Sequence, residues 1–172
     1  MASKREAPLT FDLARGEDVP QLTALLGLLL AQEADFAPDP ERQGRALEAI
    51  VGDASIGRIY VVRDGDEVIA MASLLYTVST AEGGKAAWLE DVVVRPSRRG
   101  RGIGTMLLQQ VAACARADGV LRLTLLTDPG NERGVRCRDP GLGSQRGSRR
   151  QAGIGCKGGE QQPQEPGVKF IY

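Results

Sequence analysis

The stretch from Trp88 to Thr105, WLEDVVVRPSRRGRGIGT, constrains the fold of this chain more than any other. It begins with a short apolar run rich in β-branched residues, which is typical of a buried strand. A proline and a basic, glycine-dense segment follow, and an apolar pattern with helical spacing starts at Ile103. The stretch therefore predicts a strand, a glycine-rich loop and a helix in direct succession.

The predicted loop has the composition of an anion-binding segment. Three glycines leave its backbone uncovered, so that successive N–H groups can approach a phosphate: Gly100, Gly102 and Gly104. The positive end of the following helix dipole strengthens this attraction. Three arginines would add mobile positive charge around the loop: Arg98, Arg99 and Arg101. The spacing matches neither a Walker loop nor the dinucleotide fingerprint.

Strand and helix patterns alternate through the rest of the chain as far as residue 131. Strands are predicted where β-branched runs or period-two alternation occur, at 8–13, 59–63, 68–76, 86–94 and 121–125. Helices are predicted where apolar side chains have helical spacing, at about 16–30, 40–51 and 102–118. Residues 77–85 are expected to form a polar loop. The resulting order is βααβββαβ.

Two connections fix the directions of neighbouring strands. Asp64-Gly65-Asp66 is a hairpin turn, which makes the strands on either side of it antiparallel. A helix joins the last two strands, and such a crossover makes them parallel. We therefore expect a mixed sheet flanked by helices.

Composition excludes several classes of function. The 22 basic and 22 acidic residues balance, which argues against a nucleic-acid binder. The three cysteines, Cys114, Cys137 and Cys156, occur in a sequence without histidine, so no metal site is expected. No signal peptide is evident, and the apolar run from Leu22 to Ala31 is too short to span a membrane. A soluble, cytoplasmic protein is predicted.

The organising stretch resembles the acetyl-CoA loop of the GNAT superfamily of N-acetyltransferases. Its most specific part is Leu89-Glu90-Asp91-Val92-Val93-Val94 followed by Arg99-Gly100-Arg101-Gly102-Ile103-Gly104. The resemblance covers about residues 9–131, including the order βααβββαβ. It implies an α/β (α+β) fold with a GNAT-like mixed central sheet, and acetyl-CoA as co-substrate.

The resemblance also implies a set of cofactor-binding residues. In the family, backbone after the acidic pair binds the pantetheine arm like an added strand, which here implicates Val92, Val93 and Val94. The loop would hold the pyrophosphate with Arg99, Gly100, Arg101, Gly102, Ile103, Gly104 and Thr105, and Asn131 completes the set. The valines also fit a plain core strand, and both interpretations can hold because the cofactor contact uses backbone.

Acetyl transfer by direct attack requires a deprotonated amine. An alkylamine has a pKa of about 10.4, so roughly one molecule in a thousand is nucleophilic at pH 7. Glu90 is the predicted base, because family members often carry a carboxylate at the end of this strand. The alternative is that Glu90 only pairs with an arginine. Strict alternation would direct Asp91 to the opposite face, where it could orient loop backbone, and a backbone N–H near Val92 would polarise the thioester carbonyl.

The amine acceptor is expected where the first two helices meet the loop at residues 77–85. Carboxylates and aromatic rings suit an amine, and the candidates are Glu33, Asp35, Phe36, Tyr76, Thr77 and Ser79. The same residues would also be unremarkable as solvated loop residues.

The pattern of the family breaks after Asn131. Family members commonly carry a tyrosine seven residues further on as general acid, and this chain has Arg138 there. Residues 134–172 are rich in Gly, Arg and Gln, so we divide the chain into a domain at 1–133 and an irregular tail at 134–172. A shifted reading frame or a genuine divergent tail would both give this composition. The family's final helix and strands are not expected here, which would expose the edge at residues 122–126 to self-association, for example as a homodimer.

The sequence is compatible with three functions. The first is an N-acetyltransferase acting on the primary amine of a small or amino-acid-like molecule. The second is a catalytically impaired acetyl-CoA-binding protein that lacks the tyrosine. The third is a nucleic-acid or regulatory module using Arg95, Arg98, Arg99 and Arg101, which the balanced charge disfavours.

Overall fold

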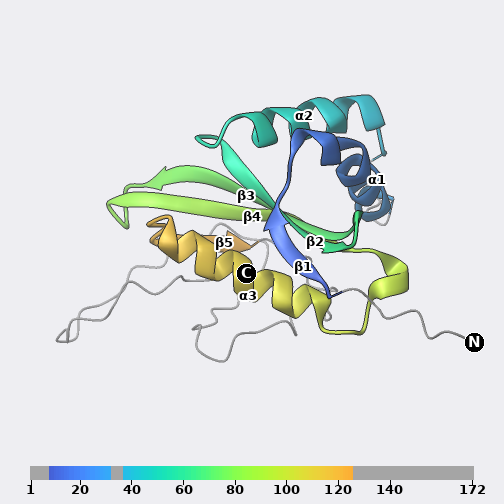
Figure 1. Ribbon diagram of the computed structural model, residues 1–172. Helices are drawn as coiled ribbons and strands as arrows, with labels where there is room; N and C mark the ends of the chain where they lie inside the picture. Colours follow the sequence, from blue (N-terminus) through green and yellow to red (C-terminus); the bar gives the residue numbers. More distant parts are fainter. Residues whose placement is uncertain (1–7, 32–36, 126–172) are drawn as a thin grey trace, which may run out of the picture.

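The computed structural model describes residues 8–31 and 37–125, which form one mixed sheet with helices on both faces (Figure 1). The strands are β1 (Thr10–Leu13), β2 (Gly57–Asp64), β3 (Glu67–Ser79), β4 (Gly84–Val94) and β5 (Arg122–Leu125). The helices are α1 (Val19–Leu30), α2 (Pro40–Gly52) and α3 (Ile103–Ala117), with short 3-10 turns at Gly16–Asp18 and Pro96–Arg98. The predicted order βααβββαβ is confirmed.

The strands lie side by side in chain order, β1-β2-β3-β4-β5. The first three pairings are antiparallel, and β4 pairs with β5 in parallel. The parallel pair follows from the α3 crossover, as the sequence predicted. Gly65 has a φ of 60°, as expected for the glycine of the turn between β2 and β3.

Each face of the sheet has its own core. Helices α1 and α2 cover one face, where Leu22 and Leu25 of α1 pack with Met71 and Val93 of the sheet. Helix α3 covers the other, where Leu107 packs in a cluster with alternate sheet residues that include Ala87 and Leu89. We call these the α1/α2 face and the α3 face. The leucine stripe of the first helix is therefore core, as predicted.

The predicted polar loop at 77–85 is wrong. Strand β3 continues to Ser79 and β4 begins at Gly84, because Thr77, Val78 and Ser79 pair with Ala86, Lys85 and Gly84. The turn itself is confined to residues 80–83, and Gly83 has a φ of 71°. Thr77 and Val78 are exposed and Ser79 is buried, so this end of the hairpin lacks the alternation of buried apolar and exposed polar side chains that marks a strand in the sequence.

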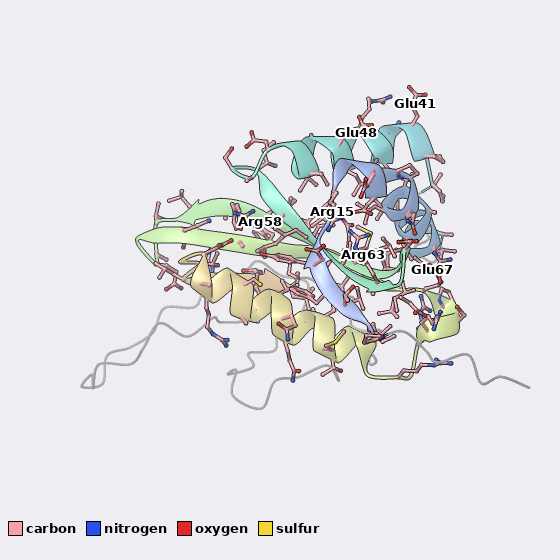
Figure 2. The ribbon with its side chains drawn as sticks, viewed as in Figure 1. Arg15, Glu41, Glu48, Arg58, Arg63 and Glu67 are labelled. Carbon is pink, nitrogen blue, oxygen red and sulfur yellow. The ribbon has the colours of Figure 1, made fainter. Side chains whose placement is uncertain are left out.

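A buried ion pair fixes the start of α1 against the sheet. Asp18 accepts two hydrogen bonds of 2.7 Å from the guanidinium of Arg63 on β2, and it also accepts the backbone N–H of Arg15. The two paired side chains are only 3% and 13% exposed. Figure 2 shows Arg63 in the interior, whereas Glu41 and Glu48 lie on the outer side of α2.

Within residues 8–31 and 37–125, no helix has both the length and the apolar character needed to cross a bilayer. The predicted tail at 134–172 lies outside the described residues, so its predicted irregularity stays a prediction.

Candidate acetyl-CoA and amine site

A β-bulge interrupts β4 at the acidic pair. Ser73 pairs with Glu90 and Met71 pairs with Val93, so two residues of β4 face the single residue Ala72 of β3. The first of these two residues is Asp91, whose φ of 48° is unusual for a residue other than glycine. The bulge shifts the alternation of side chains at this point of the strand.

The bulge places both carboxylates of the acidic pair on the α1/α2 face. Residues directly opposite each other in antiparallel strands share a face, so Ser73 and Glu90 lie on the same side. The Oγ of Ser73 donates a hydrogen bond of 2.9 Å to Oδ2 of Asp91. The prediction that Asp91 points to the opposite face is therefore wrong, because strict alternation does not count the extra residue.

The environment of these two carboxylates raises the pKa of each. Burial raises the pKa of Glu90, and the nearby charge of Asp91 raises it further. Burial also raises the pKa of Asp91, against the opposing effect of its hydrogen bond from Ser73. Among the described residues, Glu90 has no hydrogen-bond or ion-pair partner, and it is exposed. The alternative in which Glu90 pairs with an arginine does not occur in this part of the chain.

The glycine-rich loop leads from the end of β4 to the first turn of α3. Gly100 and Gly102 have φ values of 79° and 76°, a conformation that side chains disfavour. A Cβ atom added to either residue would meet nothing within 4 Å, so the space above their backbone is open. Gly102 is the N-cap of α3, which has no side-chain cap. This exposed backbone at a helix N-terminus fits a phosphate group.

The arginines before this loop are held by partners, which contradicts the prediction that they supply mobile positive charge. Arg98 forms an ion pair of 2.6 Å with Asp64, and Arg95 forms one of 3.1 Å with Glu67. These pairs tie the segment before the loop to the β2–β3 hairpin (Figure 2 labels Glu67). The Nε of Arg99 donates to the carbonyl of Val94 at 2.9 Å. The sequence could not reveal these partners, since Asp64 and Glu67 are distant in the chain.

The three valines lie just past the paired part of β4 and β5. Pairing between these strands runs from Ala86 to Leu89, opposite Arg122 to Leu125, where the described part of β5 ends. Val92, Val93 and Val94 therefore follow the last described partner on that edge. Val93 is buried beneath α1 and α2, while its two neighbours pack against the α3 cluster. Their side chains are core, and their outer backbone edge extends beyond the described end of β5.

The predicted acceptor residues do not form one group. Thr77 lies on the same face as Glu90, because it pairs with Ala86, which comes two positions before Trp88 and four before Glu90 on β4. Tyr76 instead belongs to the α3 cluster. The hydroxyl of Tyr76 donates 2.6 Å to Asp118, and Lys85 lies over its ring. Ser79 is buried, with its Oγ accepting the backbone N–H of Glu82. The acceptor candidates Glu33, Asp35 and Phe36 lie outside the described part, as does Asn131 of the predicted cofactor set.

Sequence reasoning missed three residues on the face of Glu90. Ser73 donates a hydrogen bond to Asp91. Trp88, two positions before Glu90, is 37% exposed. Arg122 pairs in register with Ala86, and its Nε is buried without a hydrogen-bond partner. The alternation of β4 could have indicated Trp88, but the other two depend on register between strands. In residues 8–31 and 37–125, no cluster of three His, Cys, Asp or Glu could hold a metal ion.

Three features define the class of this protein: the mixed sheet, the α3 crossover and the glycine-rich loop at the start of α3. Together they are the features of an α/β acetyltransferase fold. The chain matches the acetyltransferase (GNAT) family over residues 26–137, more than half of its length, and it belongs to this family. The resemblance inferred from the acidic pair and the loop is thereby confirmed. No curated protein sequence matches the chain.

Solved structures share the fold. A possible acetyltransferase from Clostridium difficile 630 has a TM-score of 0.66 and 19% identity, covering 73% of this chain and 83% of its own. A predicted acetyltransferase from Clostridium acetobutylicum, solved with acetyl-CoA, has a TM-score of 0.64 and 15% identity, covering 75% and 87%. An integron cassette protein from the mobile metagenome of Cole Harbour Salt Marsh has a TM-score of 0.63 and 29% identity, covering 84% and 91%. These similarities establish the fold.

Proposed function

We propose that this chain is a cytoplasmic N-acetyltransferase that moves the acetyl group of acetyl-CoA to a primary amine by direct attack. The observation that carries the proposal is the exposed, unpartnered carboxylate of Glu90 on the strand that leads into the glycine loop. A carboxylate there is available to a substrate instead of holding the fold together. The acceptor would be a small or amino-acid-like amine.

The loop and the strand edge would hold the co-substrate. Backbone N–H groups of residues 99–105, at the positive end of α3, suit the pyrophosphate. The backbone of Val92 to Val94 extends past the described end of β5, which suits the pantetheine arm as an added strand. The positive φ of Gly102 keeps this part of the loop free of side chains. Acetyl-CoA itself supplies the activated acyl group.

Glu90 would accept a proton from the substrate ammonium, directly or through one water molecule, and the resulting free amine would attack the thioester. Its raised pKa brings it closer to neutral pH than an ordinary carboxylate, which improves a general base. The amide near Val92, at the bulge, would polarise the thioester carbonyl. The departing thiolate, whose thiol has a pKa of about 8.5, would take up a proton from water or from the protonated Glu90. Tyr60 and Tyr76 belong to the α3 cluster, on the other face of the sheet, so neither suits this step.

Two measurements test the proposal together. Coenzyme A should raise the melting temperature of the full chain, and Gly102→Asp should abolish this rise, because a carboxylate would then repel the pyrophosphate. Release of free thiol from acetyl-CoA with a panel of primary amines should report turnover. A melting temperature that responds equally to coenzyme A in Gly102→Asp would contradict the loop assignment.

One sequence observation favours a second function, an acetyl-CoA-binding protein without efficient catalysis. Arg138 occupies the position at which the family commonly carries its tyrosine acid. Stabilisation by coenzyme A without thiol release from any amine would support this function and remove the enzymatic one.

A further inference from the structure

A row of side chains on the α1/α2 face runs outward from Glu90 and lies outside the core beneath the helices. Strand alternation and register place Trp88, Leu75 and Thr77 on this row, and Arg122 of β5 at its outer end beside Ala86. Trp88, Thr77 and Glu90 are exposed, and Leu75 and Arg122 are half-buried. We call these five side chains the open strip.

The two ends of the open strip carry opposite charges, and neither charge has an ion-pair partner among the described residues. Five arginines of the described chain are half-buried, and four of them pair with carboxylates: Arg58, Arg63, Arg95 and Arg98. Within the described ranges, Arg122 has no such partner, and its buried Nε makes no hydrogen bond. An unpaired, half-buried guanidinium is costly, and an anion placed on it would relieve that cost.

Strand geometry sets the spacing of the two charges. Arg122 lies beside Ala86, four residues before Glu90, so their Cα atoms are about 13 Å apart along the strand at roughly 3.3 Å per residue. The exposed indole of Trp88 lies midway. Two flexible side chains can shorten this gap, which leaves room for a ligand whose amine and anion are several bonds apart. An apolar linker would then lie over the indole.

From this arrangement we infer that the acceptor carries an anionic group, a carboxylate or a phosphate, in addition to its amine. Glu90 receives the amine, Trp88 contacts the linker and Arg122 binds the anion through its planar guanidinium. The inference rests on the proposed function, whose acceptor class it narrows. Arg122 is thus a specificity-determining residue for the acceptor.

The test compares three amines of equal length with different ends: 6-aminohexanoate, hexylamine and 1,6-diaminohexane. Their binding to the full chain saturated with coenzyme A is measured by calorimetry, and thiol release is measured in parallel with acetyl-CoA. Wild type should bind 6-aminohexanoate about 10- to 100-fold more tightly than hexylamine, the usual size of a hydrogen bond to a charged group. 6-Aminohexyl phosphate in place of the carboxylate distinguishes the two anions.

Variants at Arg122 should change the preference without loss of the fold. Arg122→Met should bind 6-aminohexanoate and hexylamine equally, and Arg122→Glu should prefer 1,6-diaminohexane. Arg116→Met is the matched control, because it removes the same charge from the exposed side of α3 and should keep the wild-type preference. An unchanged stabilisation by coenzyme A shows that each variant is folded, and Arg122→Lys provides a milder substitution.

The outcomes separate this inference from the proposed function. Binding of 6-aminohexanoate that depends on Arg122, without thiol release, would support the inference and contradict the enzymatic function. Turnover that is indifferent to the anionic group, or a preference that survives Arg122→Met, would overturn the inference alone. Failure of wild type to bind any of the amines would overturn it as well.

Discussion

Two carboxylates on opposite faces of the sheet, Asp118 and Glu90, have opposite environments. On the α3 face, Asp118 accepts hydrogen bonds of 2.6 Å from the Tyr76 hydroxyl and 3.1 Å from Nε of Arg58. The bond from Tyr76 is the main reason that the pKa of Asp118 is lowered. On the α1/α2 face, Glu90 has no partner among the described residues, and burial raises its pKa.

The difference separates groups that hold the fold together from groups that remain available to a ligand. Asp118 and Asp18 are both satisfied by arginines, and each has a lowered pKa. Glu90 and Asp91 sit at the bulge with raised pKa values and no arginine. Of these two, Glu90 has no hydrogen-bond partner among the described residues, and a perturbed carboxylate of this kind is a candidate for function. Substitutions of the two kinds of carboxylate should therefore affect different measurements.

The largest effect is expected for Glu90→Gln, which should lower thiol release about 100- to 10,000-fold at neutral pH, the usual contribution of a general base. The loss should shrink at high pH, where more of the amine is already deprotonated. Wild-type turnover should fall as acidification protonates Glu90, at a pH above the usual carboxylate value because its pKa is raised. The melting temperature should not fall. Equal loss at every pH would instead indicate a structural role, and Glu48→Gln on the exposed side of α2 is the control.

Asp18→Ala should have the largest effect on stability. It leaves Arg63 buried without its ion-pair partner, which costs about 3–5 kcal/mol in the free energy of unfolding. Urea denaturation measures this change. The pKa of Asp18 is lowered, chiefly by its hydrogen bond with Arg63, so the wild-type advantage should be present at neutral pH and disappear as acid protonates Asp18 below about pH 4.

Glu41→Ala is the control for this ion pair. Glu41 pairs with Arg45 at 2.7 Å on the solvent side of α2, where both side chains are exposed. Its loss should cost no more than about 0.5 kcal/mol. Equal costs for the two substitutions would refute the distinction between buried and exposed pairs.

Tyr76→Phe should cost about 1 kcal/mol of stability, because it removes a hydrogen bond to Asp118 and leaves the ring against the core. Thiol release should be unchanged, since Tyr76 lies on the face away from Glu90. A strong loss of turnover with normal stability would contradict this expectation and support the sequence-based prediction that Tyr76 contacts the acceptor.

The smallest effect is expected for Asp91→Asn, which should raise the stability of the protein, whereas Asp18→Ala and Tyr76→Phe should lower it. Asparagine tolerates the positive φ and can still accept the hydrogen bond from Ser73. Burial raises the pKa of Asp91, so the wild type loses stability as pH rises through that pKa, and the neutral amide does not. The variant should melt slightly higher at pH 7, with a gain that disappears in acid. A lower melting temperature at pH 7 would show that the ionised form is needed at the bulge.

Much of the fold could be predicted from the sequence because its signals are local. The leucine spacing of the first helix, the Asp64-Gly65-Asp66 turn and the glycines before Ile103 each act within a few residues. The parallel pairing of β4 and β5 followed from the helix between them. The hairpin end at Thr77 to Ser79 was missed, because cross-strand pairing maintains it with few apolar side chains.

The sequence by itself determined the order of the elements, the anion-type loop and the presence of two carboxylates in β4, directly before its three valines. Only the tertiary structure decided which way those carboxylates point, because the bulge adds one residue and shifts the alternation. It also decided that Arg98 is tied to Asp64 and that Arg122 lies on the face of Glu90 without a carboxylate of its own. The register between strands and the pairing between distant charges depend on residues far apart in the chain. Local sequence patterns therefore cannot predict either of them.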